Sequence, residues 1–158
     1  MNKTTIIAEP GKQEVTITRI FDAPCELVFK VSTDPEAIPH WWGPGFLKTA
    51  VESFDTKPGG KWRIVQTDPS GTTHGFHGVY HEAMAPKRIV RTFEYEGMPG
   101  HVALETSIFE NIGGKTKLTT QSVFQTLADR DGMVASGMES GVVESHNRLD
   151  VLLLKSAR

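Results

Sequence analysis

The stretch that decides the fold is residues 129–155, which read DRDGMVASGMESGVVESHNRLDVLLLK and contain no proline. Its large apolar residues recur at steps of three, four and seven, which is the spacing of one face of an α-helix. No other segment has the length for a helix of many turns, so the sequence predicts one long C-terminal helix. The residues of its apolar stripe are Met133, Val134, Met138, Val142, Leu149, Leu152 and Leu153.

Two glycines, Gly137 and Gly141, fall four residues apart inside this predicted helix. In a helix interior each glycine costs about 1 kcal/mol relative to alanine, so something should offset that cost. One explanation is close packing of the helix backbone against a sheet. The other is space that the helix leaves for a bound molecule. The helix sequence leaves both explanations open.

Composition places the chain among ordinary globular proteins. Its 158 residues carry a formal net charge of -2, which argues against nucleic acid or an anionic membrane as the main partner. The single cysteine, Cys25, excludes an internal disulfide and fits a reducing compartment. The N-terminal residues lack the apolar core of a signal peptide, and no long apolar run predicts membrane insertion. We therefore expect a cytoplasmic protein.

Upstream of the helix, the chain alternates between short elements and turns. After a lead-in over residues 1–12, residues 14–21 alternate and are rich in β-branched side chains, which predicts a strand. Residues 22–44 contain two acid-then-proline starts, typical of two short helices. From 47 to 124, six strand-like segments are separated by Gly/Pro turns, which indicates an antiparallel meander. We predict one α+β domain over residues 13–158, with a curved sheet of six to seven strands against the long helix.

Several short motifs support this element order. They are FDAP at 21–24, WWGP at 41–44, GGKWR at 59–63, FHGVY at 76–80, PKRIV at 86–90 and GMESG at 137–141. Together they resemble the helix-grip fold of the START and birch-pollen-allergen superfamily, SRPBCC, in its branch named for the activator of heat-shock protein 90 ATPase. The resemblance implies a sheet that grips a ligand under the last helix, and it supplies no shared catalytic set. Relatives often carry a tryptophan where this chain has Val142-Val143, a difference that could enlarge or reshape a cavity.

Aromatic residues of the first two thirds of the chain supply the candidate ligand site. Phe76 and Tyr80 share one face of their predicted strand, as do Phe93 and Tyr95 on the next. Rigid aromatics beside adaptable methionines suit a pocket for a flat or oily ligand, although a filled core would use the same residue types. The predicted cavity lining is Trp41, Trp42, Trp62, His74, Phe76, Tyr80, Phe93, Tyr95, Met133, Met138, Gly141 and Val142.

The histidines His74, His77 and His81 lie close together in sequence, but their spacing argues against a metal site. Alternate residues of a strand point to opposite faces, so His74 faces away from the other two. His77 and His81 lie about 13 Å apart along a flat strand, at ~3.3 Å per residue. Cys25 lacks an activating partner nearby in sequence, and no phosphate loop or dinucleotide fingerprint occurs. The sequence predicts no metal, no cofactor and no catalytic residue.

Three functions remain open, and a binding protein for a small hydrophobic or amphipathic ligand is preferred. An enzyme of the cyclase or hydrolase type would use His74, Tyr80, Arg91 and Glu105 as acid, base or oxyanion partner. Arg91 and Glu105 could equally form an exposed cross-strand charge pair. A chaperone-associated role is suggested by the branch name alone and is disfavoured. Exposed apolar surface is also compatible with a homodimer.

Overall fold

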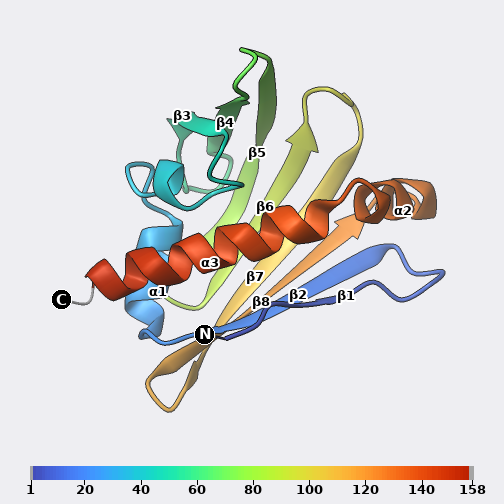
Figure 1. The fold of residues 1–158 in the computed structure, drawn as a ribbon. Helices are drawn as coiled ribbons and strands as arrows, with labels where there is room; N and C mark the ends of the chain where they lie inside the picture. Colours follow the sequence, from blue (N-terminus) through green and yellow to red (C-terminus); the bar gives the residue numbers. More distant parts are fainter. Residues whose placement is uncertain (1, 157–158) are drawn as a thin grey trace.

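The computed structural model describes residues 2–156 and combines one eight-stranded antiparallel sheet with three α-helices and a 3-10 helix (Figure 1). In chain order the elements are β1 (Thr5–Ile7), β2 (Glu14–Phe21), α1 (Cys25–Ser32), the 3-10 helix η1 (Ile38–His40), β3 (Lys48–Phe54), β4 (Lys61–Thr67), β5 (Thr73–Met84), β6 (Arg88–Tyr95), β7 (Val102–Ile112), β8 (Lys115–Phe124), α2 (Leu127–Ala135) and α3 (Met138–Ser156).

The strand order in the sheet is β1-β2-β8-β7-β6-β5-β4-β3. β3 to β8 follow one another as a meander, whereas β2 pairs with β8 from the far end of the chain. Figure 1 shows α3 lying across one face of the curved sheet, with α1 near its C-terminal end. The predicted α+β architecture, a curved antiparallel sheet gripping a C-terminal helix, is confirmed.

The lead-in contributes a strand that the sequence did not predict. Thr5–Ile7 form β1, which pairs antiparallel with residues 16–18 of β2. Three residues are too few for an alternating pattern to stand out, so only pairing with β2 reveals this edge strand.

The C-terminal segment forms two helices. The predicted long C-terminal helix is present as α3, but the prediction that one helix runs through residues 129–155 was wrong. α2 ends at Ala135, and Gly137 adopts a φ of 84° before α3 begins at Met138. This left-handed conformation favours glycine and is typical of the residue after a helix C-terminus. Gly137 therefore ends one helix and does not occupy the middle of another, which accounts for it without a ligand.

Gly141 does lie inside α3, and it is only partly buried. A Cβ atom placed on Gly141 would have no heavy atom within 4 Å. Close packing against the sheet therefore does not explain this glycine, because the backbone at this point borders open space.

The interior contains two apolar clusters. The larger is built on the residues Phe21, Val28, Trp62, Ile64, Tyr80, Phe109, Leu149 and Leu153, among others. The smaller consists of Val15, Ile17, Ala103 and Phe124, against which Met133, Met138 and Val142 pack. The apolar stripe of the C-terminal segment is thus divided, because its early residues cover the smaller cluster and Leu149 and Leu153 enter the larger one.

Polar contacts hold α3 along both flanks. On one flank, Ser145 Oγ accepts a hydrogen bond from the backbone N–H of Gly43 at 2.7 Å, and Arg148 Nη1 donates to the Gly43 carbonyl at 2.8 Å. On the other flank, Asp150 forms an ion pair with Arg19 of β2. These contacts fix how far α3 stands from the sheet, and hence how much space remains beneath it.

Candidate ligand site on the inner face of the sheet

The sheet face covered by α3, here called the inner face, brings four polar side chains into one row. The strand register pairs Tyr80 of β5 with Arg91 of β6, Arg91 with Glu105 of β7, and Glu105 with Ser122 of β8. Directly opposed residues in neighbouring strands point to the same face. These four residues, here called the polar row, therefore cross the sheet beneath α3.

Arg91 is the centre of the polar row. Its Nε donates a hydrogen bond to Glu105 Oε1 at 3.1 Å, and its Nη1 donates to Tyr80 Oη at 3.4 Å. The guanidinium Cζ also lies 4.1 Å from the ring centroid of Trp62, a cation–π geometry. Three neighbours from three strands thus fix the orientation of this side chain.

Electrostatics keep Arg91 charged and Tyr80 protonated. Burial opposes the charge of Arg91, but the Glu105 carboxylate and the Tyr80 hydroxyl outweigh burial and hold the Arg91 pKa above its ordinary value. Burial also raises the pKa of Tyr80, against the opposing effect of Arg91. At neutral pH the row therefore consists of an ion pair flanked by neutral hydroxyl groups.

The ion pair is open on one side. The Arg91 and Glu105 side chains are 18% and 20% exposed, whereas Trp62 and Tyr80 beside them are 1% and 2% exposed. Because the pair lies on the inner face, its exposed atoms are on the side of the sheet that α3 covers.

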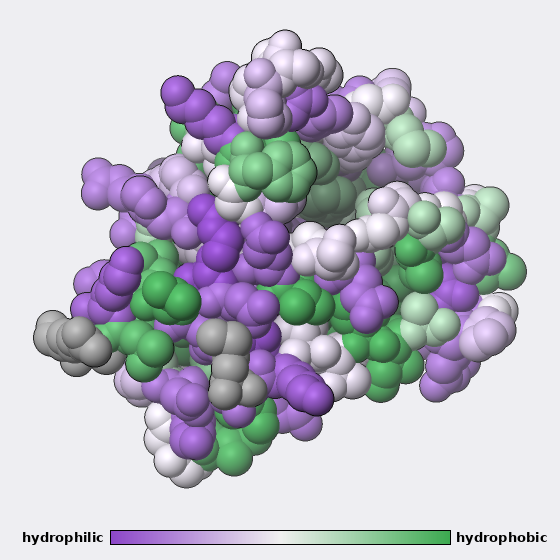
Figure 2. Space-filling model, viewed as in Figure 1, coloured by the Kyte–Doolittle hydropathy of each residue, from purple (hydrophilic) through white to green (hydrophobic). Residues whose placement is uncertain are grey.

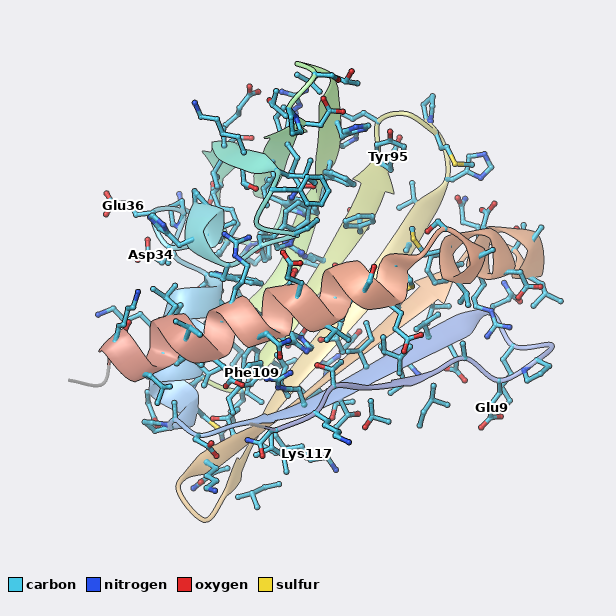
Figure 3. All side chains as sticks on the ribbon, in the orientation of Figure 1. Glu9, Asp34, Glu36, Tyr95, Phe109 and Lys117 are labelled. Carbon is cyan, nitrogen blue, oxygen red and sulfur yellow. The ribbon has the colours of Figure 1, made fainter. Side chains whose placement is uncertain are left out.

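A chain of aromatic rings leads from this pair toward the end of β6. Trp62 lies 5.9 Å from Phe93, Phe93 lies 5.6 Å from Phe76, and Phe76 lies 5.2 Å from Tyr95 and 5.1 Å from Trp42. Apart from Trp62, these rings are only partly buried, although Phe76, Phe93 and Tyr95 lie on the inner face. Figure 3 labels Tyr95 at the end of β6, above α3 in this view. The aromatic chain therefore connects the interior with the molecular surface.

The surface is hollowed where this aromatic chain ends. Figure 2 shows a depression between α3 and the β3–β6 side of the sheet, with hydrophobic residues in its floor. Gly141 lies one helical turn before Ser145, which is bonded to Gly43 in the loop between η1 and β3. Gly141 is thus on the flank of α3 that faces this side of the sheet, where an added Cβ atom would have no heavy atom within 4 Å.

The structure brings together only part of the predicted cavity lining. The aromatic members and His74 gather on the β4–β6 side, where His74 Nδ1 lies 3.0 Å from Tyr95 Oη. Trp41 packs against the larger cluster, and its Nε1 is buried without a hydrogen-bond partner among the described residues. Met133, Met138 and Val142 instead pack on the smaller cluster. The sequence could not show this division, because it follows from where α2 and the first turns of α3 lie on the sheet.

The four residues considered for catalysis do not converge. Tyr80, Arg91 and Glu105 lie together, but His74 is bonded to Tyr95 near the surface. Ser122, the fourth member of the polar row, was not identified from the sequence. Only the β7–β8 register indicates it, since a lone serine in a strand carries no signal of its own.

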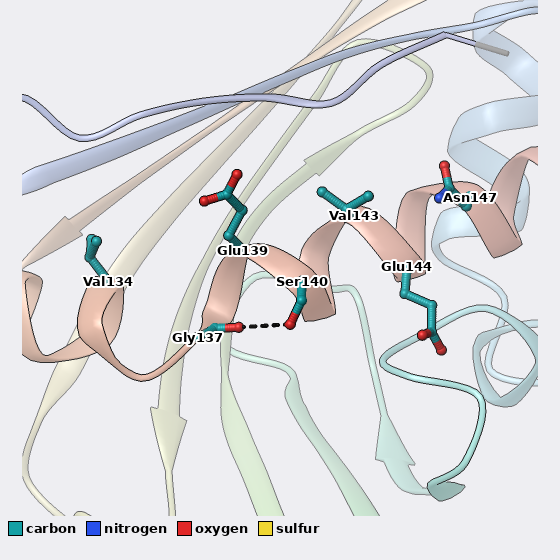
Figure 4. Close-up of a pocket in the computed structure, with 7 residues that line it drawn as sticks. All are labelled: Val134, Gly137, Glu139, Ser140, Val143, Glu144 and Asn147. Carbon is teal, nitrogen blue, oxygen red and sulfur yellow. Dashed lines mark hydrogen bonds between the residues drawn. The ribbon is translucent and has the colours of Figure 1, made fainter.

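Two further hollows lie elsewhere. One, of about 650 Å³, is lined only by residues of α2, α3 and their junction (Figure 4), namely Val134, Gly137, Glu139, Ser140, Val143, Glu144 and Asn147. A second, of about 340 Å³, is lined by Glu26, Phe29, Lys30, Thr33, Ala85 and Pro86. Neither contains a residue of the predicted cavity lining, so both are distinct from the site on the inner face.

Metal-binding geometry is not found within residues 2–156, where no three or more His, Cys, Asp or Glu side chains are placed to hold an ion. His77 lies on the opposite face of β5 from His74, with its Nδ1 2.9 Å from Glu96 Oε2. Cys25 is buried, with its sulfur 3.4 Å from Thr116 Oγ1. In the same part of the chain, no helix is both long and apolar enough to cross a membrane.

Comparison with known proteins identifies the family. The model of the family described as "Activator of Hsp90 ATPase homolog 1-like protein" matches residues 22–154. No curated protein matches the chain. Among solved structures, a Rhodobacter sphaeroides protein is similar at 28% sequence identity with a TM-score of 0.88, covering 97% of this chain and 99% of that chain.

Two other solved structures show the same likeness. A Staphylococcus epidermidis protein is 28% identical with a TM-score of 0.80, and the match covers 96% of this chain and 94% of that chain. An Arthrobacter aurescens protein, 24% identical with a TM-score of 0.87, covers 96% of this chain and 91% of that chain and shows the fold alone. With the family model spanning most of the sequence, the chain belongs to the activator of Hsp90 ATPase homolog 1-like family, within the SRPBCC superfamily.

Proposed function

We propose that this protein binds a small hydrophobic or amphipathic molecule between the sheet and α3, without chemical conversion. The observation that carries the proposal is the chain of partly buried aromatic rings that ends at the partly exposed Arg91–Glu105 pair. A filled core would enclose such rings. Rings that stay accessible on an inner face are instead typical of a pocket, where apolar walls supply affinity and a few polar groups set orientation.

Binding is favoured over catalysis by the state of the polar groups. Arg91 and Glu105 are paired with each other, and the Tyr80 hydroxyl accepts a hydrogen bond from Arg91. A general acid or base needs a proton that it can exchange near neutral pH. The pKa values of Arg91 and Tyr80 are raised, which moves both groups further from proton exchange near neutral pH.

The test is binding of the neutral dye N-phenyl-1-naphthylamine, followed by its fluorescence increase. We expect the parent protein to bind the dye and Gly141→Leu to weaken binding about tenfold or more, because the new side chain fills open space beside α3. Native mass spectrometry of the purified protein would reveal a retained natural ligand.

Gly132→Leu is the matched control. Gly132 is also helical and also has no atom within 4 Å of an added Cβ, but it is exposed on α2. This variant should bind the dye like the parent. Absence of dye binding by the parent, or equal binding by all three proteins, would contradict a ligand site at this position.

The family description raises a chaperone role as an alternative, since it names an activator of the Hsp90 ATPase. A ligand-binding protein of this fold should leave the ATPase rate of the host chaperone unchanged. Stimulation of that rate by the parent protein, retained in Gly141→Leu, would favour the chaperone role over ligand binding.

A further inference from the structure

We infer that Arg91 and Glu105 form a subsite for a neutral head group that both accepts and donates a hydrogen bond, such as a hydroxyl or a carboxamide. The inference rests on the proposed function, because it names the chemistry of the ligand that the same space would take.

The first argument is unused hydrogen-bonding capacity. Arginine has five N–H donors and a carboxylate has two acceptor oxygens. Arg91 uses Nε for Glu105 and Nη1 for Tyr80, and Glu105 uses Oε1. Among the contacts of residues 2–156, Arg91 Nη2 and Glu105 Oε2 have no hydrogen-bond partner, and neither atom is enclosed by protein. A donor and an acceptor thus remain available on one ion pair.

The second argument is pre-organisation. The Trp62 ring lies against the guanidinium group at 4.1 Å, and Tyr80 and Glu105 hold two of its nitrogens. A ligand would therefore meet a donor whose orientation is already fixed, so less side-chain freedom is lost on binding.

The third argument is charge. The pair is neutral as a unit, and its neighbours in the polar row, Tyr80 and Ser122, carry no charge at neutral pH. An anionic head group would gain from Arg91 but would also face the Glu105 carboxylate. A neutral group gains both hydrogen bonds without that repulsion, so the subsite selects neutral over anionic ligands.

The aromatic chain indicates the chemistry of the remainder of the ligand. Ring-to-ring distances of 5.1 to 5.9 Å link Trp62 to Phe93, Phe76, Tyr95 and Trp42. A flat apolar body can lie along these rings while its polar end reaches Arg91. The ligand class is accordingly a flat hydrophobic molecule with one hydroxyl or carboxamide group at its inner end.

Three probes of one shape test this chemistry: 2-naphthol, 2-methylnaphthalene and 2-naphthoate, with affinities measured by calorimetry or dye displacement at neutral pH. The parent should bind 2-naphthol about tenfold more tightly than 2-methylnaphthalene, the size expected for a hydrogen bond to a charged group. It should bind 2-naphthoate more weakly than 2-naphthol.

Two variants separate recognition from loss of structure. In the double variant Arg91→Met/Glu105→Met, the affinity ratio of 2-naphthol to 2-methylnaphthalene should fall to about one. The same variant should bind 2-methylnaphthalene at least as tightly as the parent does. In Glu105→Gln, 2-naphthoate should bind about tenfold more tightly than to the parent, since the repelling carboxylate is gone. Structural damage would not produce such a gain.

The matched control is the ion pair of Arg63 and Glu96 on the outer side of the sheet. Arg63→Met/Glu96→Met should leave all three affinity ratios unchanged. An equal affinity of the parent for 2-naphthol and 2-methylnaphthalene, or a ratio that survives the inner double variant, would overturn the subsite while leaving ligand binding intact. If none of 2-naphthol, 2-methylnaphthalene and 2-naphthoate binds, the subsite is refuted for this ligand class. The proposed function then fails only if N-phenyl-1-naphthylamine also does not bind.

Discussion

Arg19 of β2 and Asp150 of α3 form an ion pair beneath the C-terminal helix, with side chains only 1% and 13% exposed. Arg19 Nη1 also donates to Thr4 Oγ1 and to Asn147 Oδ1, both at 3.0 Å. The pair therefore ties α3 to the sheet on the flank opposite the loop that carries Gly43. The residues joined by these contacts come from β2, from α3 and from the position before β1.

Loss of Asp150 should destabilise the fold strongly. Asp150→Ala leaves the buried Arg19 charge without its partner, and breaking a buried pair in this way costs about 3–5 kcal/mol. Urea unfolding measures the change in unfolding free energy. Asp22→Ala is the control, since the Asp22–Lys115 pair is more than half exposed on both sides and should contribute little. Equal effects of the two changes would contradict a structural role for the Arg19–Asp150 pair.

His146 should make stability depend on pH. Burial, with the nearby Arg19 charge, lowers the pKa of His146 from 6.5 to about 4. Its Nδ1 lies 2.8 Å from Thr4 Oγ1, which accepts from Arg19 and can donate only to an unprotonated nitrogen. The unfolded chain binds the proton near pH 6.5 and the folded chain only near pH 4, so stability falls as pH drops through this window.

The size of this effect is up to about 3 kcal/mol. Urea unfolding of the parent and of His146→Gln at about pH 7 and about pH 4.5 isolates it. This range avoids most of the contribution from Glu96, whose pKa the Arg63 hydrogen bonds lower to about 2. The parent should lose more stability than the variant over this range, and parallel losses would show that His146 does not titrate abnormally.

Two glycines of the C-terminal segment, Gly137 and Gly141, should respond oppositely to alanine. Gly137→Ala places a side chain at a φ of 84° and should destabilise by about 1–2 kcal/mol. Gly141→Ala adds a methyl group to a helical position with no atom within 4 Å, and it should stabilise by up to about 1 kcal/mol. Thermal unfolding of the two variants measures whether each change lowers or raises stability. Destabilisation by Gly141→Ala would mean that the space beside it is smaller than the structure indicates.

Thr126 should act as the N-cap of α2. Its Oγ1 accepts a hydrogen bond from the Asp129 backbone N–H at 3.1 Å. Thr126→Ala should therefore cost about 1 kcal/mol of unfolding free energy, and Thr126→Asp should restore it. If the aspartate variant is as unstable as the alanine variant, loss of the cap is not the cause.

Much of the fold could be predicted from local sequence pattern. Alternation at 14–21 and Gly/Pro turns between 47 and 124 indicated strands that the structure contains, and the apolar spacing of 129–155 indicated helix. The break at Gly137 was missed because helical spacing on both sides continues in phase across it. β1 was missed because a three-residue edge strand has no periodicity of its own.

The candidate site was only partly visible in the sequence. Strand alternation correctly placed Phe76 with Tyr80 and Phe93 with Tyr95 on shared faces. It could not show that Arg91 pairs with Glu105 on the inner face, because that depends on the register between β6 and β7. Nor could it show that Met138 packs on the smaller cluster, away from the aromatic chain.

The sequence by itself determined the kinds of elements and their order, because helix and strand periodicities and turn residues act over a few neighbouring positions. Tertiary structure alone decided which side chains meet. The register of long-range strand pairs built the polar row of Tyr80, Arg91, Glu105 and Ser122. The contacts of Arg19 and Ser145 set the distance of α3 from the sheet. Both depend on pairing between distant segments, which no local pattern records.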